Sequence, residues 1–188
     1  MFSCNMTILG DKAQTIDREQ RDVLTFLPKI LGKQMRAIVM NRSYRNTIEV
    51  ANYAKTISGD EEIEFLERHG KEVEEIQCTS ETEMWERVLE KLHVGGEGYE
   101  TAAVLTMTEQ EARCAYNYLK QRRKDVHYVD RDSSSFKKGV TVTTFYLAKG
   151  LEFDQVFIAG GNEEHPFYKQ FQYISATRAL HELYKIGT

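Results

Sequence analysis

The chain contains few cysteines and no long apolar segment. Its three cysteines, Cys4, Cys78 and Cys114, lie far apart and form no C-x-x-C pair, so neither a disulfide framework nor a metal site is expected. Their odd number fits a reducing compartment. No run of about 18 apolar residues occurs, so we expect no membrane-spanning helix. The first residues lack a basic region followed by a long apolar core, so we expect no signal peptide and a cytoplasmic location.

The chain also lacks an excess of positive charge. Its 25 lysines and arginines are outnumbered by 29 aspartates and glutamates, which gives a formal net charge of −4. The total charge therefore provides no global attraction for nucleic acid, although it does not exclude a local basic groove. The 41% hydrophobic and 29% charged content is ordinary for a globular domain. A length of 188 residues suits one sizeable domain, or one domain with a short appendage.

Short apolar runs alternate with segments of helical periodicity along the chain. The runs predict strands at 6–10, 35–40, 73–78, 102–107, 126–129, 140–145, 155–160 and 182–186. Helices are predicted at 19–31, which Pro28 should interrupt or end, and at 41–57, 80–94, 108–122 and 168–180. This alternation predicts an α/β fold with a mostly parallel sheet flanked by helices. Because ligands gather at the carboxyl ends of parallel strands, functional side chains are expected just after the strands.

Two turns contain residues with either a structural or a functional interpretation. In the stretch ILGDKAQTI, Asp11 could simply cap a turn, whereas Gln14 could sense a phosphate or orient a water. In TTFYLAKGLEF, Gly150 permits a backbone conformation that is closed to other residues. Glu152 could then accept hydrogen bonds from ribose hydroxyls or from backbone amides. A Lys-Gly-x-Glu turn alone is weak support for a site, but the whole string between two strands is far more specific.

Two further stretches contain arginines that could bind phosphate. In SYRNT, Thr47 or its neighbour Asn46 could be a helix N-cap and Arg45 a solvated residue. Alternatively, Arg45 faces a phosphate near a helix N-terminus, and Tyr44 stacks on a base. In YISATRALHELY, Arg178 is expected within an amphipathic helix. It is there either an exposed surface residue or a group that reaches a γ-phosphate across a cleft.

These four stretches, in this order, resemble the motifs of superfamily 1 helicases of the UvrD/Rep/PcrA type. GDKAQTI is similar to their G-D-x-x-Q-x-I motif, and SYRNT is similar to N-Y-R-S-T. TTFYLAKGLEF resembles T-I-H-x-x-K-G-L-E-F, and YISATRALHELY resembles Y-V-x-x-T-R-A-x-x-x-L-Y. The resemblance covers nearly the whole chain, with 58–138 matched only by the order of elements. TTFYLAKGLEFD is most similar to the HelD subgroup, which includes ATPases associated with RNA polymerase.

The resemblance implies an ATP cleft between two RecA-like domains. Gln14 would sense the γ-phosphate, and Tyr44 would stack on the adenine. Arg45 and Arg178 would stabilise charge on the transferred phosphoryl group, while Glu152 would bind the ribose. Closure of the cleft on ATP and its reopening after hydrolysis would move one domain along a nucleic-acid strand.

The resemblance also implies a track for single-stranded DNA. Lys149 and Tyr146 would face this track, and Gly150 would set the turn beside them. Tyr146 stands where the family commonly has a histidine that contacts DNA. This departure leaves the partner open between single-stranded DNA and RNA polymerase.

The phosphate-binding half of such a site is missing from the sequence. No G-x-x-x-x-G-K-S/T motif occurs, and no Asp-Glu pair ends an apolar strand. In this family both elements belong to an upstream RecA-like domain, which would hold most of the ATP and Mg²⁺. The resemblance therefore implies that 1–34 is the end of that first domain with a linker, and that 35–188 is the second RecA-like domain.

Three functions remain possible at this point. The first is the C-terminal motor domain of an ATP-dependent DNA helicase or translocase, and the second is a HelD-like ATPase that remodels RNA polymerase. The third is a degenerate motor domain that serves as an interaction module. In the first two cases the 188-residue chain alone is expected to be inactive as an ATPase, because it lacks the phosphate-binding loop.

Overall fold

The computed structural model describes residues 7–17, 23–32, 38–40, 42–59, 64–65, 67–95, 98–133 and 137–188. The helices are η1 (Lys12–Gln14), α1 (Val23–Leu31), α2 (Ile48–Ser58), α3 (Glu81–Lys91), α4 (Glu109–Lys120) and α5 (Tyr168–Ala176). The strands are β1 (Arg42–Ser43), β2 (Glu64–Phe65), β3 (Glu74–Gln77), β4 (Thr101–Thr106), β5 (Val126–Tyr128), β6 (Gly139–Thr144), β7 (Phe153–Ala159) and β8 (Ala179–Gly187). None of the helices in these ranges has the length and apolar character needed to cross a membrane.

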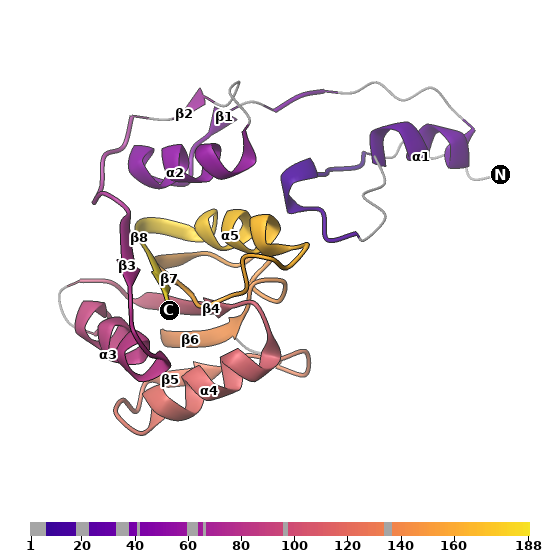
Figure 1. The fold of residues 1–188 in the computed structure, drawn as a ribbon. Helices are drawn as coiled ribbons and strands as arrows, with labels where there is room; N and C mark the ends of the chain where they lie inside the picture. Colours follow the sequence, from indigo (N-terminus) through magenta and orange to yellow (C-terminus); the bar gives the residue numbers. More distant parts are fainter. Residues whose placement is uncertain are drawn as a thin grey trace.

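A six-stranded sheet organises the molecule (Figure 1). Its strand order is β3-β8-β7-β4-β6-β5, and every neighbouring pair is parallel. Helices α3 and α4 cover one face, whereas α5 covers the other face with α2 packed beside it. Strands β1 and β2 form a separate parallel pair. The predicted α/β fold with a parallel sheet between helices is therefore confirmed.

The apolar runs form central strands because both faces of the sheet are covered. On β4, Val104 packs toward α3 and α4, whereas its neighbour Leu105 packs toward α5. Phe157 and Ile158 divide in the same way on β7, and all four side chains are at most 1% exposed. Successive residues of a strand point to opposite faces, so a strand between two helical layers is largely apolar on both faces.

The starts of α3 and α4 follow from their capping residues. At the start of α3, the Ser80 hydroxyl accepts a hydrogen bond from the Glu83 amide at 3.2 Å. The Glu83 carboxylate does not return to Ser80, and it accepts instead from the amide and hydroxyl of Thr79. A reciprocal capping box does form at α4 between Thr108 and Glu111.

Several predicted boundaries near the N-terminus are wrong. Residues 7–10 and 38–40 form no strand, and residues 35–37 of the predicted strand at 35–40 lie outside the described residues. Helix α1 continues through Pro28 to Leu31. Helix α2 begins at Ile48 rather than at 41, because 42–43 pair with β2 and Thr47 adopts an extended backbone.

The last helix also ends earlier than predicted. Thr177 is the C-cap of α5, and Arg178 lies at the junction between α5 and β8. The carbonyl of Arg178 accepts a hydrogen bond from the amide of Phe153 at 3.0 Å. This bond draws Arg178 into the first rung of the sheet between β7 and β8, so the prediction that it lies within a helix is wrong.

The connection from β6 to β7 determines where the functional residues lie. Both strands pair with β4 in parallel, and Val140 and Gln155 both lie level with Ala102. Residues 145–152 must therefore run back along the α5 face from the carboxyl end of β6 to the amino end of β7. We call this segment the backward connection. As a result, Tyr146 lies at the carboxyl ends of the strands and Glu152 lies at their amino ends.

Candidate functional site

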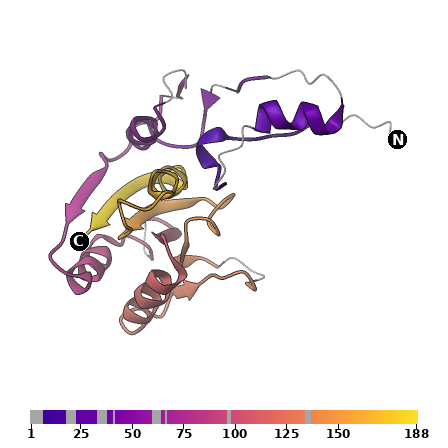
Figure 2. The ribbon, with the colours of Figure 1, turned by 45° about the vertical axis from the view of Figure 1, so that its right-hand side comes forward.

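A cavity of about 520 Å³ lies beside the amino ends of β7 and β8. Its walls include Gln14, Tyr44, Arg45 and Arg178, which come from three of the four motif stretches. The segment at 7–17, the loop before α2 and the C-terminal end of α5 meet here (Figures 1 and 2). The structure thus brings four predicted residues together across 164 positions of sequence, from 14 to 178. It does so at the amino ends of the strands, whereas the carboxyl ends were expected.

Glu152, from the remaining motif stretch TTFYLAKGLEF, lies at this site through an ion pair. The Nε atom of Arg45 lies 2.9 Å from Oε1 of Glu152, and the two side chains are 45% and 42% exposed. Glu152 directly precedes β7 in the backward connection, which explains why it lies near the start of β8. The predicted ribose-binding group and one predicted phosphate-binding group are therefore neighbours.

Arg178 is held far more firmly than Arg45. Its side chain is buried, and its Nε and Nη1 atoms donate to the carbonyls of Ile174 and Leu151 at 3.2 and 3.3 Å. Its Nη2 atom donates to the hydroxyl of Thr177 at 3.1 Å. The guanidinium is therefore fixed in one orientation by groups on α5 and on the backward connection.

Charges around the cavity act on Arg178 in opposite directions. Burial lowers the pKa of its guanidinium, and the positive charge of Arg45 lowers it further. Glu152 and Asp11 raise the pKa but do not cancel the first two effects. A bound anion would offset the repulsion between the two arginines, so this arrangement favours a negatively charged ligand.

The turn that contains Gln14 is fixed by its own residues. The carboxylate of Asp11 accepts hydrogen bonds from the amide of Ala13 at 2.9 Å and from Nε2 of Gln14 at 2.8 Å. Asp11 therefore caps the turn, as expected from its side chain. The Nζ atom of Lys149 donates to the Gln14 carbonyl at 3.1 Å, so Lys149 joins this turn to the backward connection.

Two further predicted features lie at or near the cavity. Tyr44 is 62% exposed on the cavity wall, so its ring is accessible to a planar partner. Gly150 has a φ of +88°, and an added Cβ would meet open space. The predicted glycine-specific backbone conformation is therefore confirmed, and its cause is the turn itself rather than a close neighbour.

Tyr146 lies apart from these residues. Its hydroxyl donates to Oε1 of Glu109 at 2.9 Å, on the helix that follows β4. Its ring packs edge-on against Phe145, with centroids 5.5 Å apart. The structure therefore does not bring Tyr146 into the cavity with the other predicted residues.

Several residues of the site were not singled out from the sequence. Tyr173 and Thr177 line the cavity from the α5 side, and their spacing of four residues on one helix is the pattern that could have revealed them. Asn46, considered only as a possible helix cap, donates to the carbonyl of Ala179. Arg68 donates to the backbone carbonyls of Arg45 and Leu180, and no motif in the sequence marks it.

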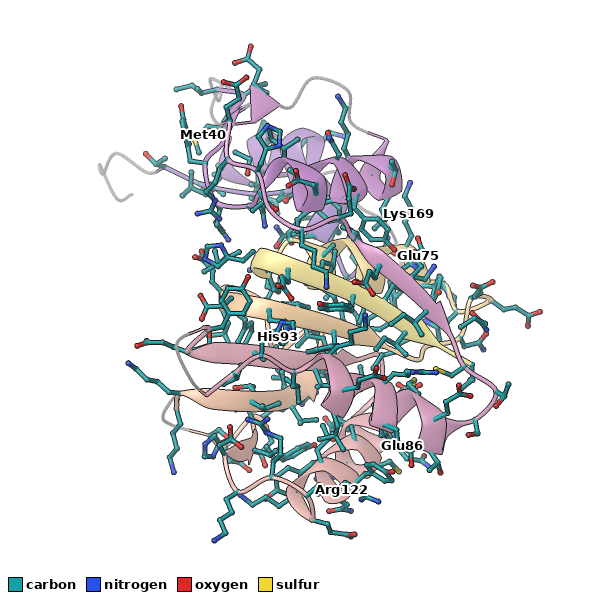
Figure 3. All side chains as sticks on the ribbon, turned by 90° about the vertical axis from the view of Figure 1, so that its left-hand side faces the viewer. Met40, Glu75, Glu86, His93, Arg122 and Lys169 are labelled. Carbon is teal, nitrogen blue, oxygen red and sulfur yellow. The ribbon has the colours of Figure 1, made fainter. Side chains whose placement is uncertain are left out.

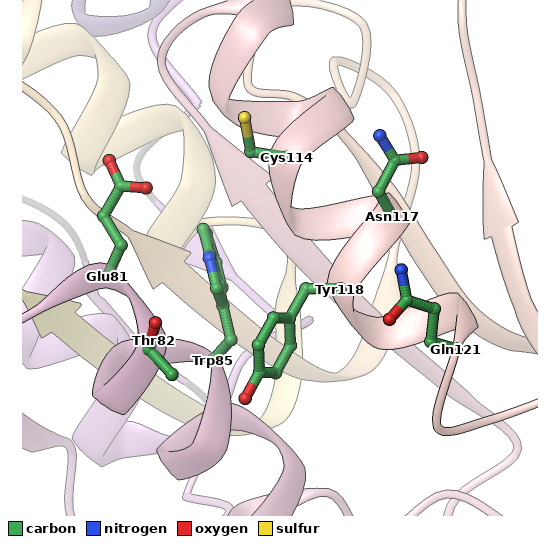
Figure 4. A pocket seen from close by; sticks show the side chains of 7 residues that line it. All are labelled: Glu81, Thr82, Trp85, Cys114, Asn117, Tyr118 and Gln121. Atoms are coloured by element: carbon green, nitrogen blue, oxygen red, sulfur yellow. The ribbon is translucent and has the colours of Figure 1, made fainter.

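A second cavity, of about 350 Å³, lies between α3 and α4 (Figure 4). Trp85, Cys114 and Tyr118 are among its lining residues, and none of the predicted site residues borders it. Across the described part of the chain, no three His, Cys, Asp or Glu side chains are grouped so that they could hold a metal ion.

Comparison with known proteins gives a structural relationship only. No family model matches the chain, and no curated protein matches it. The chain is similar to the crystal structure of the C-terminal domain of a possible DNA helicase from Lactobacillus plantarum WCFS1. The TM-score is 0.63 and the identity 25%, over 78% of this chain and 88% of that one. An arterivirus helicase, nonstructural protein 10, solved with DNA, has a TM-score of 0.44 and 18% identity, over 61% of this chain and 28% of that one.

The first of these similarities supports the helicase resemblance of the motifs. The chain has the α/β fold of a RecA-like domain found at the C-terminus of a possible DNA helicase. The second similarity is too weak to carry an argument. Neither matched protein is described as a HelD-type ATPase, so the assignment to that subgroup stays a prediction.

Proposed function

We propose that the chain is the C-terminal motor domain of an ATP-dependent DNA helicase or translocase, and that its cavity is one wall of an ATP cleft. The observation that carries this proposal is the convergence of an exposed aromatic ring, two guanidinium groups and an amide on one cavity of about 520 Å³. A purine base requires a flat apolar surface, and a triphosphate requires cationic donors. The similarity to a possible DNA helicase domain supports the same function.

Arg45 and Glu152 would exchange partners when nucleotide binds. An exposed ion pair contributes only about 0–1 kcal/mol, so little free energy opposes its separation. Arg45 would then pair with phosphate oxygens, and Glu152 would accept hydrogen bonds from the ribose hydroxyls. Tyr44, next to Arg45 in the chain, would stack on the adenine while remaining open to solvent on its other side.

Arg178 would act on the γ-phosphate as a preorganised charge. Its guanidinium is already oriented by the carbonyls of Ile174 and Leu151, so little reorganisation is needed when charge develops on the phosphoryl group. Gln14 also lines the cavity and would respond to the presence of that phosphate. Lys149 holds the Gln14 turn against the backward connection, which links nucleotide binding to the segment expected to face DNA.

An upstream RecA-like domain would complete the cleft. The sequence contains no phosphate-binding loop, so ATP and Mg²⁺ would be held largely by that domain, with 1–34 as its last part. Closure and reopening of the cleft would move 35–188 along single-stranded DNA. Tyr146 and Lys149 would contact the strand.

One observation favours the alternative, a HelD-like ATPase that remodels RNA polymerase. The Tyr146 hydroxyl is bonded to the carboxylate of Glu109, and a carboxylate beside the ring repels a phosphate backbone. The two alternatives differ in their response to nucleic acid. Single-stranded DNA should stimulate ATP turnover by a helicase, whereas a polymerase-remodelling ATPase should respond to RNA polymerase instead.

The proposed function is tested by Arg178→Ala and Arg178→Lys in the full-length protein. Because an arginine in this role contributes about 10³-fold or more to phosphoryl transfer, we expect ATP turnover to fall by at least about 100-fold. Nucleotide affinity should change much less. Arg87→Ala, which removes an exposed side chain of α3 that pairs with Glu90, is the control and should leave turnover unchanged.

Two results would contradict the proposal. Unchanged turnover in a folded Arg178 variant would remove this residue from the reaction. Substantial ATP hydrolysis by the purified 188-residue chain would show that the cleft needs no upstream domain. Circular dichroism of each variant distinguishes loss of activity from loss of folding.

A further inference from the structure

Arg68 lies outside every motif and yet joins the two arginine-bearing segments of the cavity. Its Nη2 atom donates to the carbonyl of Arg45 and to the carbonyl of Leu180, at 2.6 Å in each case. These acceptors lie 23 and 112 positions away in the sequence. One belongs to the residue whose side chain faces Glu152, and the other lies two residues after Arg178.

The backbone around Arg68 is itself fixed to the start of α2. The carbonyl of Arg68 accepts a hydrogen bond from the amide of Ile48 at 2.9 Å. Two residues later, the amide of Gly70 donates to Glu49 at 2.8 Å. A Cβ at Gly70 would collide with the side chain of Thr47, so this close approach requires glycine. The guanidinium therefore extends from a rigid support.

Arg68 supplies the charged part of the connection between these segments. The loop before α2 and the start of β8 are also joined by Asn46, whose amide donates to the Ala179 carbonyl. A hydrogen bond from a guanidinium is about twice as strong as one between neutral groups. One guanidinium nitrogen that bonds both carbonyls also sets the distance between them.

We propose that Arg68 is a positioning residue that holds Arg45 and Arg178 at the separation needed for phosphoryl transfer. This inference rests on the proposed function, because it assigns Arg68 a role in the same cleft. Both acceptors of Arg68 are backbone carbonyls, so it acts through the backbone that carries the two side chains. A displacement of about 1 Å at a reacting group can reduce turnover by about 100-fold, so a loosened connection should affect turnover more than nucleotide binding.

The experiment compares Arg68→Gln, Arg68→Lys and Arg123→Gln in the full-length protein. Arg123 is a matched control, because its Nη2 atom also donates to a backbone carbonyl, that of Val94, at 2.9 Å. Arg68→Gln should lower kcat about tenfold or more with a smaller change in KM, after normalisation to the folded fraction. Arg68→Lys keeps the charge and one donor group, so it should recover part of kcat. Arg123→Gln should leave kcat within about twofold.

Hydrogen exchange provides a readout that does not depend on ATP. In the 188-residue chain, Arg68→Gln should accelerate amide exchange in 44–48 and 178–181 relative to the central strand β4. Unchanged exchange there overturns the proposal, as does an unchanged kcat or an equal loss of kcat in Arg123→Gln. If the unsubstituted full-length protein hydrolyses no ATP, the proposed function fails. The exchange measurement then decides alone whether Arg68 holds the two segments together.

Discussion

Two arginines of the cavity differ in how the surrounding residues hold them. Arg178 is 3% exposed and bonded to backbone carbonyls, whereas Arg45 is exposed and bonded to one carboxylate. A buried guanidinium keeps its orientation, and an exposed one can change partners at little cost in free energy. The pair therefore combines a fixed charge with a movable one, which suits a site that must first bind a ligand and then act on it.

Loss of the contact between Arg45 and Glu152 should weaken ATP binding but hardly change the stability of the fold. Glu152→Gln removes an ion pair in which both side chains are more than 40% exposed, so the free energy of unfolding should change by less than about 1 kcal/mol. Urea unfolding of the 188-residue chain measures this value. In the full-length protein, the same substitution should raise KM for ATP several-fold, because a ribose acceptor is weakened.

Glu100→Gln is the control for this substitution. It removes the exposed ion pair between Glu100 and Lys138. Neither of these residues lines the cavity that contains Arg45 and Arg178. The substitution should therefore reproduce the small effect on stability but leave KM unchanged. A loss above about 2 kcal/mol in Glu152→Gln would show that the ion pair has a structural role instead.

Among the connecting elements, two glycines with positive φ differ in their surroundings. Gly139 opens β6 with a φ of +110°, and a Cβ there would collide with the carbonyl of Asp125. That carbonyl accepts a hydrogen bond from the amide of Val140, so the segments around Asp125 and Gly139 cannot move apart freely. Gly150 has a φ of +88° and open space around it.

Alanine at these two positions should therefore have unequal effects. Gly150→Ala should cost about 1–2 kcal/mol, the penalty for a left-handed backbone with a Cβ. Gly139→Ala should cost more, because the steric collision with the Asp125 carbonyl adds to the same penalty. Urea unfolding monitored by circular dichroism measures both values. A larger loss for Gly150→Ala would contradict this order.

The sequence predicted the sheet and its helices better than it predicted their ends. The strands β4, β6 and β7 were found close to their observed positions, because apolar runs between polar segments admit few other structures. The end of α5 was missed because the pairing of Phe153 with Arg178 joins residues 25 positions apart. No local pattern contains such a pairing.

The composition of the cavity was also predicted better than its position. Gln14, Tyr44, Arg45 and Arg178 do line one cavity, as the order of motifs indicated. The predicted position at the carboxyl ends of the strands was wrong. The chain runs back to the amino end of β7 within 145–152 instead of passing through a helix. Arg68 could not be found, since its role depends on two carbonyls whose positions only the folded chain defines.

At the scale of the whole molecule, a polar network around Glu182 connects strands β7 and β8 to the loop before β4. The carboxylate of Glu182 on β8 accepts hydrogen bonds from Nε2 of Gln155 at 2.9 Å and from the hydroxyl of Tyr184 at 2.8 Å. The hydroxyl of Tyr99 adds a third bond at 3.2 Å. His93, which is labelled in Figure 3, has its Nδ1 atom 3.4 Å from the same carboxylate. The network thus joins β7 and β8 to the loop before β4.

These contacts determine how stability should depend on pH. Burial raises the pKa of Glu182, but hydrogen bonds from Tyr184 and Gln155, with the positive charge of His93, outweigh it. The pKa in the folded state therefore lies below its ordinary value of 4.5. A lowered carboxyl pKa contributes stability that is present above the ordinary value and is lost as pH falls through the folded value.

Glu182→Gln tests this dependence. At pH 7 the variant should be less stable than the unsubstituted chain, because its amide cannot accept as many hydrogen bonds from the surrounding donors. The difference in the free energy of unfolding should shrink as pH falls below 4.5, because protonation removes the same acceptor from Glu182. Urea unfolding across this range measures the difference, with Glu164→Gln, an exposed substitution, as the control. A difference that stays constant with pH would show that packing around Glu182, rather than its charge, stabilises the centre of the sheet.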